Sequence, residues 1–240
     1  MKQGELRIIP TPIGNLEDIT LRGLRLLRES SIIACEDTRV TGRLLKLLEI
    51  GAKHLLSLHA HNERKRIAEL LDRMQAGEHV ALVSDAGTPG LSDPGSALIA
   101  GAINAGIRVE VLPGATAAIP ALIGSGLKTR PALFEGFLPQ KKGRQTRLRE
   151  LSLIEATLIL YESPHRLLKL LRELQEHFRE ETPVVVAREI SKIHEEYVRG
   201  TSRTLLEEFE SRPSVKGEIV VLIQGSGVGR SQDGERKEGR

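Results

Sequence analysis

The feature of this sequence that most constrains its fold is an alternation of short apolar runs with longer amphipathic segments. The short runs of the first half are rich in β-branched residues, as strands are. The segments between them place apolar residues three or four positions apart, which is the spacing of one helix face. We predict strands at residues 6–9, 32–35, 55–58, 80–84 and 109–112, and helices at 21–27, 43–48, 67–74 and 96–105. This alternation indicates an α/β domain with a parallel sheet covered on both faces.

The second half repeats the alternation after a segment of small residues at 115–126, which we expect to be a closely packed helix. Gly124-Ser125-Gly126-Leu127 then has the composition of a hinge, and we place a domain boundary there. The expected parts are an N-terminal α/β domain at 1–125, a C-terminal α/β domain at 126–224 and a disordered, charged tail at 225–240. The predicted strands of the second domain are 133–137, 157–161, 184–188, 193–198 and 218–223. Only residues 189–192 separate the third and fourth of these strands, so we expect a hairpin and a mixed sheet.

Composition excludes several classes of protein. No apolar stretch approaches the roughly 18 residues of a membrane-spanning helix. Residues 1–6 lack the apolar core of a signal peptide, so we expect a cytoplasmic protein without a membrane partner. The single cysteine, Cys35, excludes an internal disulfide and a thiolate-held zinc or iron–sulfur centre, and we predict no metal site.

Positive charge is concentrated in one segment. Residues 1–125 carry 14 basic and 14 acidic side chains, whereas residues 128–149 carry seven basic side chains and one acidic one. Such a stretch is typical either of a surface that docks a polyanion or of a solvated loop and helix face, and the charge pattern alone leaves both interpretations open.

The densest chemical signal is the segment SDAGTPGLSDPG at residues 84–95. It follows an apolar strand and precedes a helix, and ligands of open α/β sheets bind at that edge. Its three glycines let a ligand approach the main-chain amides, while Asp85 and Asp93 offer acceptors for hydroxyl or amino groups. We favour a ligand loop over a stiff connection. No G-x-G-x-x-G follows the first strand and no P-loop is present, which argues against NAD and ATP.

Further polar residues follow other predicted strands of the first sheet. PTPIGNLEDIT (10–20) and EDTR (36–39) fall on the same sheet edge, although helix capping by Asp37 or Thr38 would also explain the second string. His59 and His61 follow the third strand, where they would form half of a metal site or supply a proton acceptor. Loops that share one edge favour a binding site there.

Seven ordered strings resemble the small-subunit ribosomal RNA methyltransferase I family, a branch of the tetrapyrrole methylase superfamily. They are PTPIGNLEDIT (10–20), EDTR (36–39), SDAGTPGLSDPG (84–95), PGATA (113–117), ESPHR (162–166), AREISK (187–192) and GEIVVLI (217–223). The resemblance implies a homodimer of two-domain chains with S-adenosylmethionine in a cleft between the domains. It also implies methyl transfer to the ribose 2′-hydroxyl of a cytidine in 16S ribosomal RNA near the decoding centre.

The resemblance carries site residues over by position. The residues implied to bind S-adenosylmethionine are Pro12, Ala86, Gly87, Thr88, Pro89, Gly90, Leu91, Asp93, Ala115, Thr116, Tyr161, Ala187, Gly217 and Glu218. A ribose hydroxyl is a poor nucleophile, so a general base would help. We hypothesise that Asp37 or Lys192 takes the proton, with His59 as a further candidate, and that Arg39 holds a flanking phosphate.

With six aromatic residues in the chain, we expect phosphate contacts rather than base stacking to bind the RNA. The predicted RNA-binding residues are Lys128, Arg130, Lys141, Lys142, Arg144 and Arg147. Pro12-Ile13-Gly14-Asn15 departs from the glycine-richer loop of the tetrapyrrole enzymes, which argues against a porphyrin substrate. The alternatives are a tetrapyrrole- or protein-modifying methyltransferase, a non-catalytic RNA-binding assembly factor and a metal-dependent hydrolase built on His59 and His61.

Overall fold

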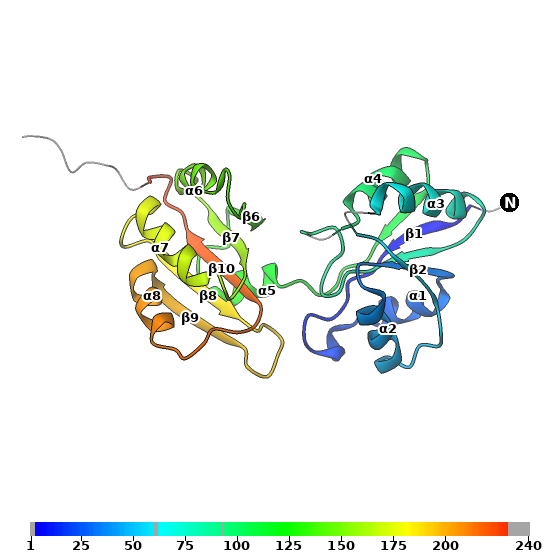
Figure 1. Ribbon diagram of the computed structural model, residues 1–240, viewed down its shortest axis with the longest axis horizontal. Helices are drawn as coiled ribbons and strands as arrows, with labels where there is room; N and C mark the ends of the chain where they lie inside the picture. Colours follow the sequence, from blue (N-terminus) through cyan, green and yellow to red (C-terminus); the bar gives the residue numbers. More distant parts are fainter. Residues whose placement is uncertain (1–2, 60–61, 93, 230–240) are drawn as a thin grey trace, which may run out of the picture. The chain divides into compact units, whose positions relative to one another are not determined.

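A computed structural model describes residues 3–59, 62–92 and 94–229 of the chain. Contacts divide the chain into two compact units, Met1–Thr116 and Ala117–Arg240, which are described separately here (Figure 1). Each unit contains one five-stranded sheet. The predicted α/β class, with a parallel first sheet and a mixed second sheet, is confirmed. None of the helices in the described ranges is long and apolar enough to cross a membrane.

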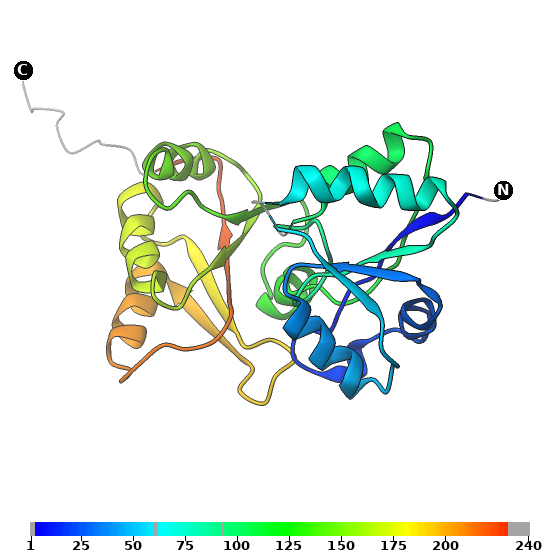
Figure 2. The same cartoon turned by 45° about the vertical axis from the view of Figure 1, so that its right-hand side comes forward.

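The first unit is a parallel sheet between two pairs of helices (Figures 1 and 2). Its elements are β1 (Glu5–Ile8), the 3-10 turn η1 (Leu16–Asp18), α1 (Leu21–Glu29), β2 (Ile32–Cys35), α2 (Thr38–Leu47), β3 (His54–Ser57), α3 (Glu63–Gln75), β4 (Val80–Leu82), α4 (Ser96–Asn104) and β5 (Arg108–Val111). The strand order is β3-β2-β4-β1-β5, and every neighbouring pair is parallel.

Alternating side chains of these strands form two separate apolar cores. Leu6, Ile8 and Ile32 pack with buried residues of α3 and α4. Ile33 and Cys35 face the other way and pack with α1 and α2. Burying a Leu or Ile side chain stabilises a fold by roughly 1.5–3 kcal/mol, so both helix layers hold the sheet in place. The loops after the strands therefore emerge from a rigid base.

The second unit has a mixed sheet in the order β6-β7-β10-β8-β9. Its elements are α5 (Ala118–Ser125), β6 (Ala132–Phe137), α6 (Arg144–Ser152), β7 (Thr157–Glu162), α7 (Leu167–His177), β8 (Pro183–Arg188), β9 (Glu196–Thr201), α8 (Ser202–Glu210) and β10 (Ile219–Gln224). Strands β6 and β7 are parallel, while β10 is antiparallel to both β7 and β8, and β8 is antiparallel to β9. The last strand of the chain thus lies in the middle of this sheet.

Helices α6, α7 and α8 cover one face of the second sheet through a core that includes Leu148, Leu171 and Phe209. Helix α5 contacts β8, β9 and β10. The Tyr197 hydroxyl donates to the carbonyl of Pro120 at 3.3 Å, and neighbouring Val198 packs into the core on the opposite face. Successive strand residues point to opposite faces, so α5 lies on the face away from the other three helices.

The division between the two units falls earlier in the sequence than the boundary that we expected at residue 125. The division falls between Thr116 and Ala117, because α5 packs against strands of the second sheet. The hairpin between β8 and β9 is also longer than expected. Strand β9 begins at Glu196 rather than at Ile193, whose side chain is 97% exposed in the connecting turn. The rest of the expected tail, from residue 230 onward, lies outside the described residues.

Candidate functional site

The loops that follow β1 and β4 are bonded directly to each other. The amide of Thr11 donates to the carbonyl of Gly87 at 2.9 Å, and the amide of Gly87 donates to the carbonyl of Thr11 at 2.9 Å. The Thr11 hydroxyl, fully buried, donates to the carbonyl of Ser84 at 3.0 Å. All strands of this sheet are parallel, so the loops after them share one edge, which we call the first-sheet edge (residues 10–20, 36–39, 58–59, 62 and 84–92).

The glycine loop of the first-sheet edge offers main-chain donors. Gly87 and Gly90 have φ angles of +83° and +81°, which side-chain-bearing residues rarely adopt. The Thr88 hydroxyl donates to the carbonyl of Ala115 at 2.9 Å and fixes the loop against the segment after β5. Within the described residues, the amides of Thr88 and Gly90 donate to no protein acceptor. They are therefore available to a ligand. Asp93 lies outside the described residues.

Three carboxyl groups lie beside this loop. The amide of Asp37 donates to Oδ1 of Asp85 at 3.2 Å, which joins the loop after β2 to the loop after β4. Desolvation and the charge of Asp37 raise the pKa of Asp85, although the bond from the Asp37 amide opposes the shift. Desolvation and the charges of Asp85 and Asp37 likewise raise the pKa of Glu36. These two carboxyl groups hold protons more tightly than ordinary carboxyl groups do.

Asp37 has the opposite electrostatics. Its carboxylate accepts from the main chain of Arg39 at 2.8 Å and so caps α2, and it pairs with the Arg39 guanidinium at 2.6 Å. The side-chain and main-chain bonds from Arg39 lower the pKa of Asp37 to about 2. A carboxylate of such low basicity is a weak proton acceptor at neutral pH. The Arg39 side chain is 90% exposed, which suits contact with a phosphate.

His59 follows β3 on the same edge. Its amide donates to Oδ1 of Asn62 at 2.9 Å, and Nδ2 of Asn62 donates to the carbonyl of Ser57 at 3.0 Å. The positive form of His59 favours the ionised form of Glu36, so the two groups are electrostatically coupled. His61 lies outside the described residues, and the described part of the chain contains no group of three His, Cys, Asp or Glu side chains that could hold a metal ion.

A second group of the predicted residues gathers at one edge of the second sheet. The carboxyl ends of β7 and β8 meet the amino end of β10, where Ile219 pairs with both Glu162 and Arg188. We call the loops there the second-sheet edge (residues 162–166, 188–195 and 214–218). Tyr161 contacts Phe134 and Phe137 edge to face, with ring centroids 5.2 and 5.6 Å apart.

Glu189 organises the second-sheet edge. Its Oε1 accepts from the amide of Glu218 at 2.9 Å and from Nζ of Lys192 at 2.9 Å. Lys192 also lies 3.2 Å from Oε2 of Glu218. Gly217 has a φ of +93°, and a Cβ there would lie 2.4 Å from the Glu189 carboxyl group. The position thus requires glycine for its backbone conformation and for the space that Glu189 occupies.

Lys192 is held as a cation in this arrangement. Burial lowers its pKa, but the hydrogen bonds and charges of Glu189 and Glu218 outweigh that effect and raise it. The hypothesis that Lys192 is the general base is therefore unfavourable, because an ammonium ion between two carboxylates has no lone pair to accept a proton. Its ammonium group joins the carboxylates of Glu189 and Glu218.

The predicted basic segment does not form one surface. Lys128 and Arg130 precede β6, whereas Lys141 and Lys142 follow it, and a six-residue strand separates the pairs by about 20 Å. Arg147 is neutralised by Glu135 at 2.6 Å and Glu150 at 2.9 Å.

The structure contradicts the prediction that Arg144 binds RNA. Its side chain is 2% exposed and donates to Glu162 at 3.0 Å and to Glu173 at 2.8 Å. A buried guanidinium whose donors already contact two carboxylates cannot reach an RNA phosphate. The sequence pattern could not separate it from its exposed neighbours, because the charge run gives no indication of which face of α6 is buried.

Comparison with known proteins identifies the chain. The sequence profile of the tetrapyrrole (corrin/porphyrin) methylases matches residues 5–206. A ribosomal RNA small subunit methyltransferase I from Synechocystis sp. is 49% identical over 93% of this chain and 80% of its own length. One from Hydrogenobaculum sp. is 47% identical over 91% of this chain and 95% of its own length. The chain is a member of the ribosomal RNA small subunit methyltransferase I family. It is thus an S-adenosylmethionine-dependent methyltransferase.

A solved structure supports the family fold. Uroporphyrin-III C-methyltransferase from Thermus thermophilus, complexed with S-adenosylhomocysteine, has a TM-score of 0.64 and 19% sequence identity, covering 93% of this chain and 98% of its own. At this identity the comparison establishes the fold of this ribosomal RNA small subunit methyltransferase I family member.

Sequence reasoning missed Glu189, the residue that fixes Lys192 and Glu218 in this family member. Its position inside the AREISK string was a signal, but its left-handed backbone, with φ at 54°, was not visible in the sequence. Glu36 was predicted to lie at the sheet edge as part of the EDTR string, without a role of its own. Its pKa is raised by burial and then by the charge of Asp85, which is 49 positions away and approaches it only through the fold.

Proposed function

We propose that the chain transfers a methyl group from S-adenosylmethionine to the ribose 2′-hydroxyl of a cytidine in small-subunit (16S) ribosomal RNA, near the decoding centre. The observation that carries the proposal is the 49% identity, over 93% of the chain, to a relative with the name ribosomal RNA small subunit methyltransferase I. The donor and acceptor groups of the first-sheet edge support it.

The residues of the first-sheet edge fit the chemical groups of S-adenosylmethionine. Amides such as those of Thr88 and Gly90 suit a carboxylate, and the carboxyl group of Asp85 suits an ammonium or hydroxyl group. When bound, the donor supplies a sulfonium-activated methyl group. In the first unit, the residues that would hold it are Pro12, Ala86, Gly87, Thr88, Pro89, Gly90, Leu91, Asp93, Ala115 and Thr116. Tyr161, Ala187, Gly217 and Glu218, which the resemblance also implies, belong to the second unit.

The chain's own contribution is chiefly alignment of the ribose oxygen with the methyl carbon, since the methyl group is already activated. Proton removal adds a smaller factor, roughly 10²–10⁴-fold for a general base. Asp37 is too weak a base and Lys192 is protonated, so we assign proton acceptance to His59, the remaining candidate at the first-sheet edge. Arg39, whose side chain is 90% exposed, then serves as a cationic contact for an RNA phosphate, and Lys192 holds Glu189 and Glu218 together.

The test is transfer of labelled methyl from S-adenosylmethionine to isolated small ribosomal subunits, to naked 16S ribosomal RNA and to uroporphyrinogen. We expect one ribose-methylated cytidine in the RNA, mapped by methylation-sensitive cleavage, and no label in the tetrapyrrole. Label in the tetrapyrrole alone, or donor binding without any RNA methylation, would contradict the proposal.

A matched pair of glycine variants tests the donor site. Gly87→Ala should weaken donor binding, because Gly87 has a φ of +83° within the loop and a Cβ there would contact Ile13 at 3.4 Å. Gly106→Ala has the same kind of backbone penalty, with a φ of +69°, but nothing lies within 4 Å of its Cβ. Donor affinity should fall about tenfold or more in the first variant and stay within twofold in the second.

The proposal extends to assembly and location. We infer that the chain acts as a homodimer in the cytoplasm, where its ribosomal substrate is made. Light scattering of the purified protein should give twice the 26.4 kDa chain mass, and a monomer with full methyl transfer would remove the homodimer from the proposal.

A further inference from the structure

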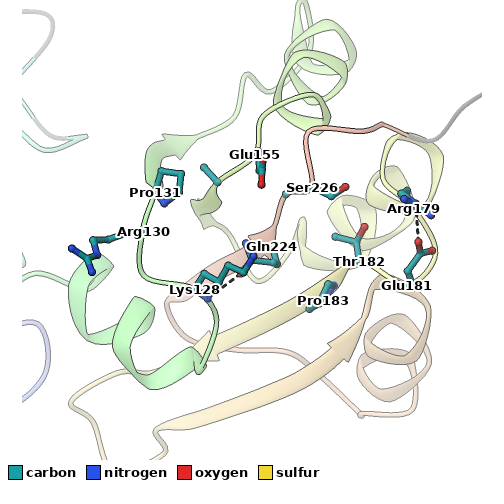
Figure 3. A pocket seen from close by; sticks show the side chains of 12 residues that line it. Lys128, Arg130, Pro131, Glu155, Arg179, Glu181, Thr182, Pro183, Gln224 and Ser226 are labelled. Carbon is teal, nitrogen blue, oxygen red and sulfur yellow. Dashed lines mark hydrogen bonds and ion pairs between the residues drawn. The ribbon is translucent and has the colours of Figure 1, made fainter.

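A pocket of about 340 Å³ lies in the second unit at the edge opposite to the second-sheet edge (Figure 3). It is formed where β6, β7 and β8 begin and where β10 ends, and Pro131, Ala156, Pro183 and Gln224 mark these four places. Strands of six residues separate it from the second-sheet edge by about 20 Å. The pocket is therefore separate from the residues assigned to methyl transfer.

Two cations of the pocket have no acidic partner. Lys128 and Arg130 are exposed, and within the described residues neither makes an ion pair with a carboxylate. Arg179 and Glu181 pair with each other at 2.7 Å, which leaves Glu155 as the remaining acid among the lining residues. The lining thus carries a net charge of +1, from three basic and two acidic side chains.

Gln224 presents a donor to the pocket. The amide of Lys128 donates to Oε1 of Gln224 at 2.9 Å, which fixes that atom as the oxygen. The hydroxyl of Thr157, which lies 3.2 Å from the same oxygen, donates its hydrogen to the Lys128 carbonyl at 2.6 Å. The side-chain NH₂ of Gln224 makes no hydrogen bond within the described residues, so it can serve a ligand.

Thr182 adds a second polar group. Its side chain lines the pocket at 7% exposure, and its hydroxyl has no hydrogen-bond partner within the described residues. The lining contains no aromatic ring, so it offers no stacking surface for a base. Pro131 and Pro183 instead provide small apolar faces of the size of a ribose.

We propose that this pocket binds a sugar-phosphate unit of the substrate RNA and anchors the strand away from the reacting nucleotide, an inference that rests on the proposed function. Lys128 and the Gln224 amide contact the phosphate, Thr182 contacts the ribose, and Arg130 contacts the next phosphate from the rim, where its guanidinium is directed outward (Figure 3). A single net charge on an open surface is too little to retain a small anion in water. A polyanion gains additional affinity by releasing counterions.

The experiment measures binding of the full chain to naked 16S ribosomal RNA at several salt concentrations. The test variant is Lys128→Glu/Arg130→Glu. We expect its affinity for the RNA to fall about tenfold or more. The plot of log affinity against log salt should become shallower by about 1.4 in slope, because two phosphate contacts are lost. Affinity for S-adenosylmethionine should be unchanged. Thr182→Val, which removes a hydroxyl without changing charge, should weaken RNA binding severalfold.

The matched control is Arg28→Glu/Lys46→Glu, which makes the same charge change at two exposed cations in the last turns of α1 and α2. Equal affinity and slope in the test variant would overturn the proposal, and so would an equal loss in the control. Loss of inorganic phosphate binding with unchanged RNA binding would show a small-anion site instead. Wild-type chain that binds the RNA but transfers no methyl would contradict the proposed function and leave the pocket assignment standing.

Discussion

The amide of Asp37 donates a hydrogen bond to the carboxyl group of Asp85 at 3.2 Å. The two residues are 48 positions apart, and each is the second or third residue after its strand in the parallel first sheet. Two loops with acidic residues are thus joined by a neutral main-chain donor. Hydrogen bonds from Arg39 lower the pKa of the Asp37 carboxyl group, whereas burial raises the pKa of the Asp85 carboxyl group.

Asp85→Asn should not destabilise the protein at neutral pH. A carboxyl group with a raised pKa in the folded state favours folding at low pH, and that contribution is lost as pH rises through the folded pKa. Asparagine does not ionise, so the variant does not lose this stability as pH rises. Its amide oxygen can still accept the hydrogen bond from the Asp37 amide. We expect a gain of up to about 1 kcal/mol at pH 7.5 that disappears near pH 3, measured by urea unfolding.

The matched control for that measurement is Asp72→Asn, at an exposed position of α3, where the change should stay within about 0.5 kcal/mol at both pH values. A loss of more than 1 kcal/mol for Asp85→Asn at pH 7.5 would show that the charge of Asp85 stabilises the fold. Donor affinity of the same variant should fall, because the proposed acceptor for the donor's ammonium group becomes neutral.

Two substitutions of Lys192 distinguish a cationic contact from a general base. Arginine cannot lose its proton in proteins, so Lys192→Arg would abolish a base but preserve a cation. We expect Lys192→Arg to keep single-turnover methylation within about tenfold of wild type and Lys192→Met to lose about 10- to 100-fold, because Glu189 and Glu218 lose the cation that joins them. Equal loss of the chemical step in both variants, at saturating RNA, would restore Lys192 as the base.

Gly217→Ala should disrupt the second-sheet edge. A Cβ at this position would lie 2.4 Å from the Glu189 carboxyl group, which holds Lys192 and the Glu218 amide. We expect destabilisation of about 2–3 kcal/mol, from the positive φ and the steric conflict together. Gly126→Ala has a positive φ with nothing within 4 Å and should cost about 1 kcal/mol. Similar thermal midpoints for both variants would mean that Glu189 moves aside freely.

Arg144→Met should destabilise the second unit without an RNA-specific effect. It leaves Glu162 and Glu173 buried without the guanidinium that joins them, a kind of loss that costs about 3–5 kcal/mol. Lys141→Glu/Lys142→Glu, at exposed positions beside it, should leave stability within about 0.5 kcal/mol and weaken RNA binding. Weaker RNA binding by folded Arg144→Met, at a temperature where it is fully native, would return Arg144 to the RNA surface.

Most strands were predictable because burial on both faces requires continuous apolar runs. The sequence prediction for β2 at 32–35 coincides with the structure, and the predictions for β1, β3 and β5 are displaced by one residue. Helix starts were less accurate. Helix α2 begins at Thr38 instead of residue 43, because Asp37 caps it and the first turn contributes few apolar residues to the core.

The candidate site was predictable as a set of loops but not as a set of charges. Parallel topology explains why residues 10–20 and 84–92 meet, since each follows a strand at the same edge. The state of each ionisable group depends on partners distant in sequence. Glu218, which helps to keep Lys192 protonated, is 26 positions from it in the sequence. Glu173, which accepts a hydrogen bond from the buried Arg144, is 29 positions from it. Local pattern contains no information on such pairs.

The central place of β10 affects how the chain matures. Strands β7 and β8 pair with β10 on its two sides, and β10 is the last of the described strands to be synthesised. The first unit contains all of its strands by residue 111 and can fold while synthesis continues. Until residue 224 emerges, the second sheet consists of the parallel pair β6–β7 and the β8–β9 hairpin, and their unpaired strand edges are sites of misassembly. Nascent chains of this protein therefore depend on rapid synthesis of the segment that contains β10.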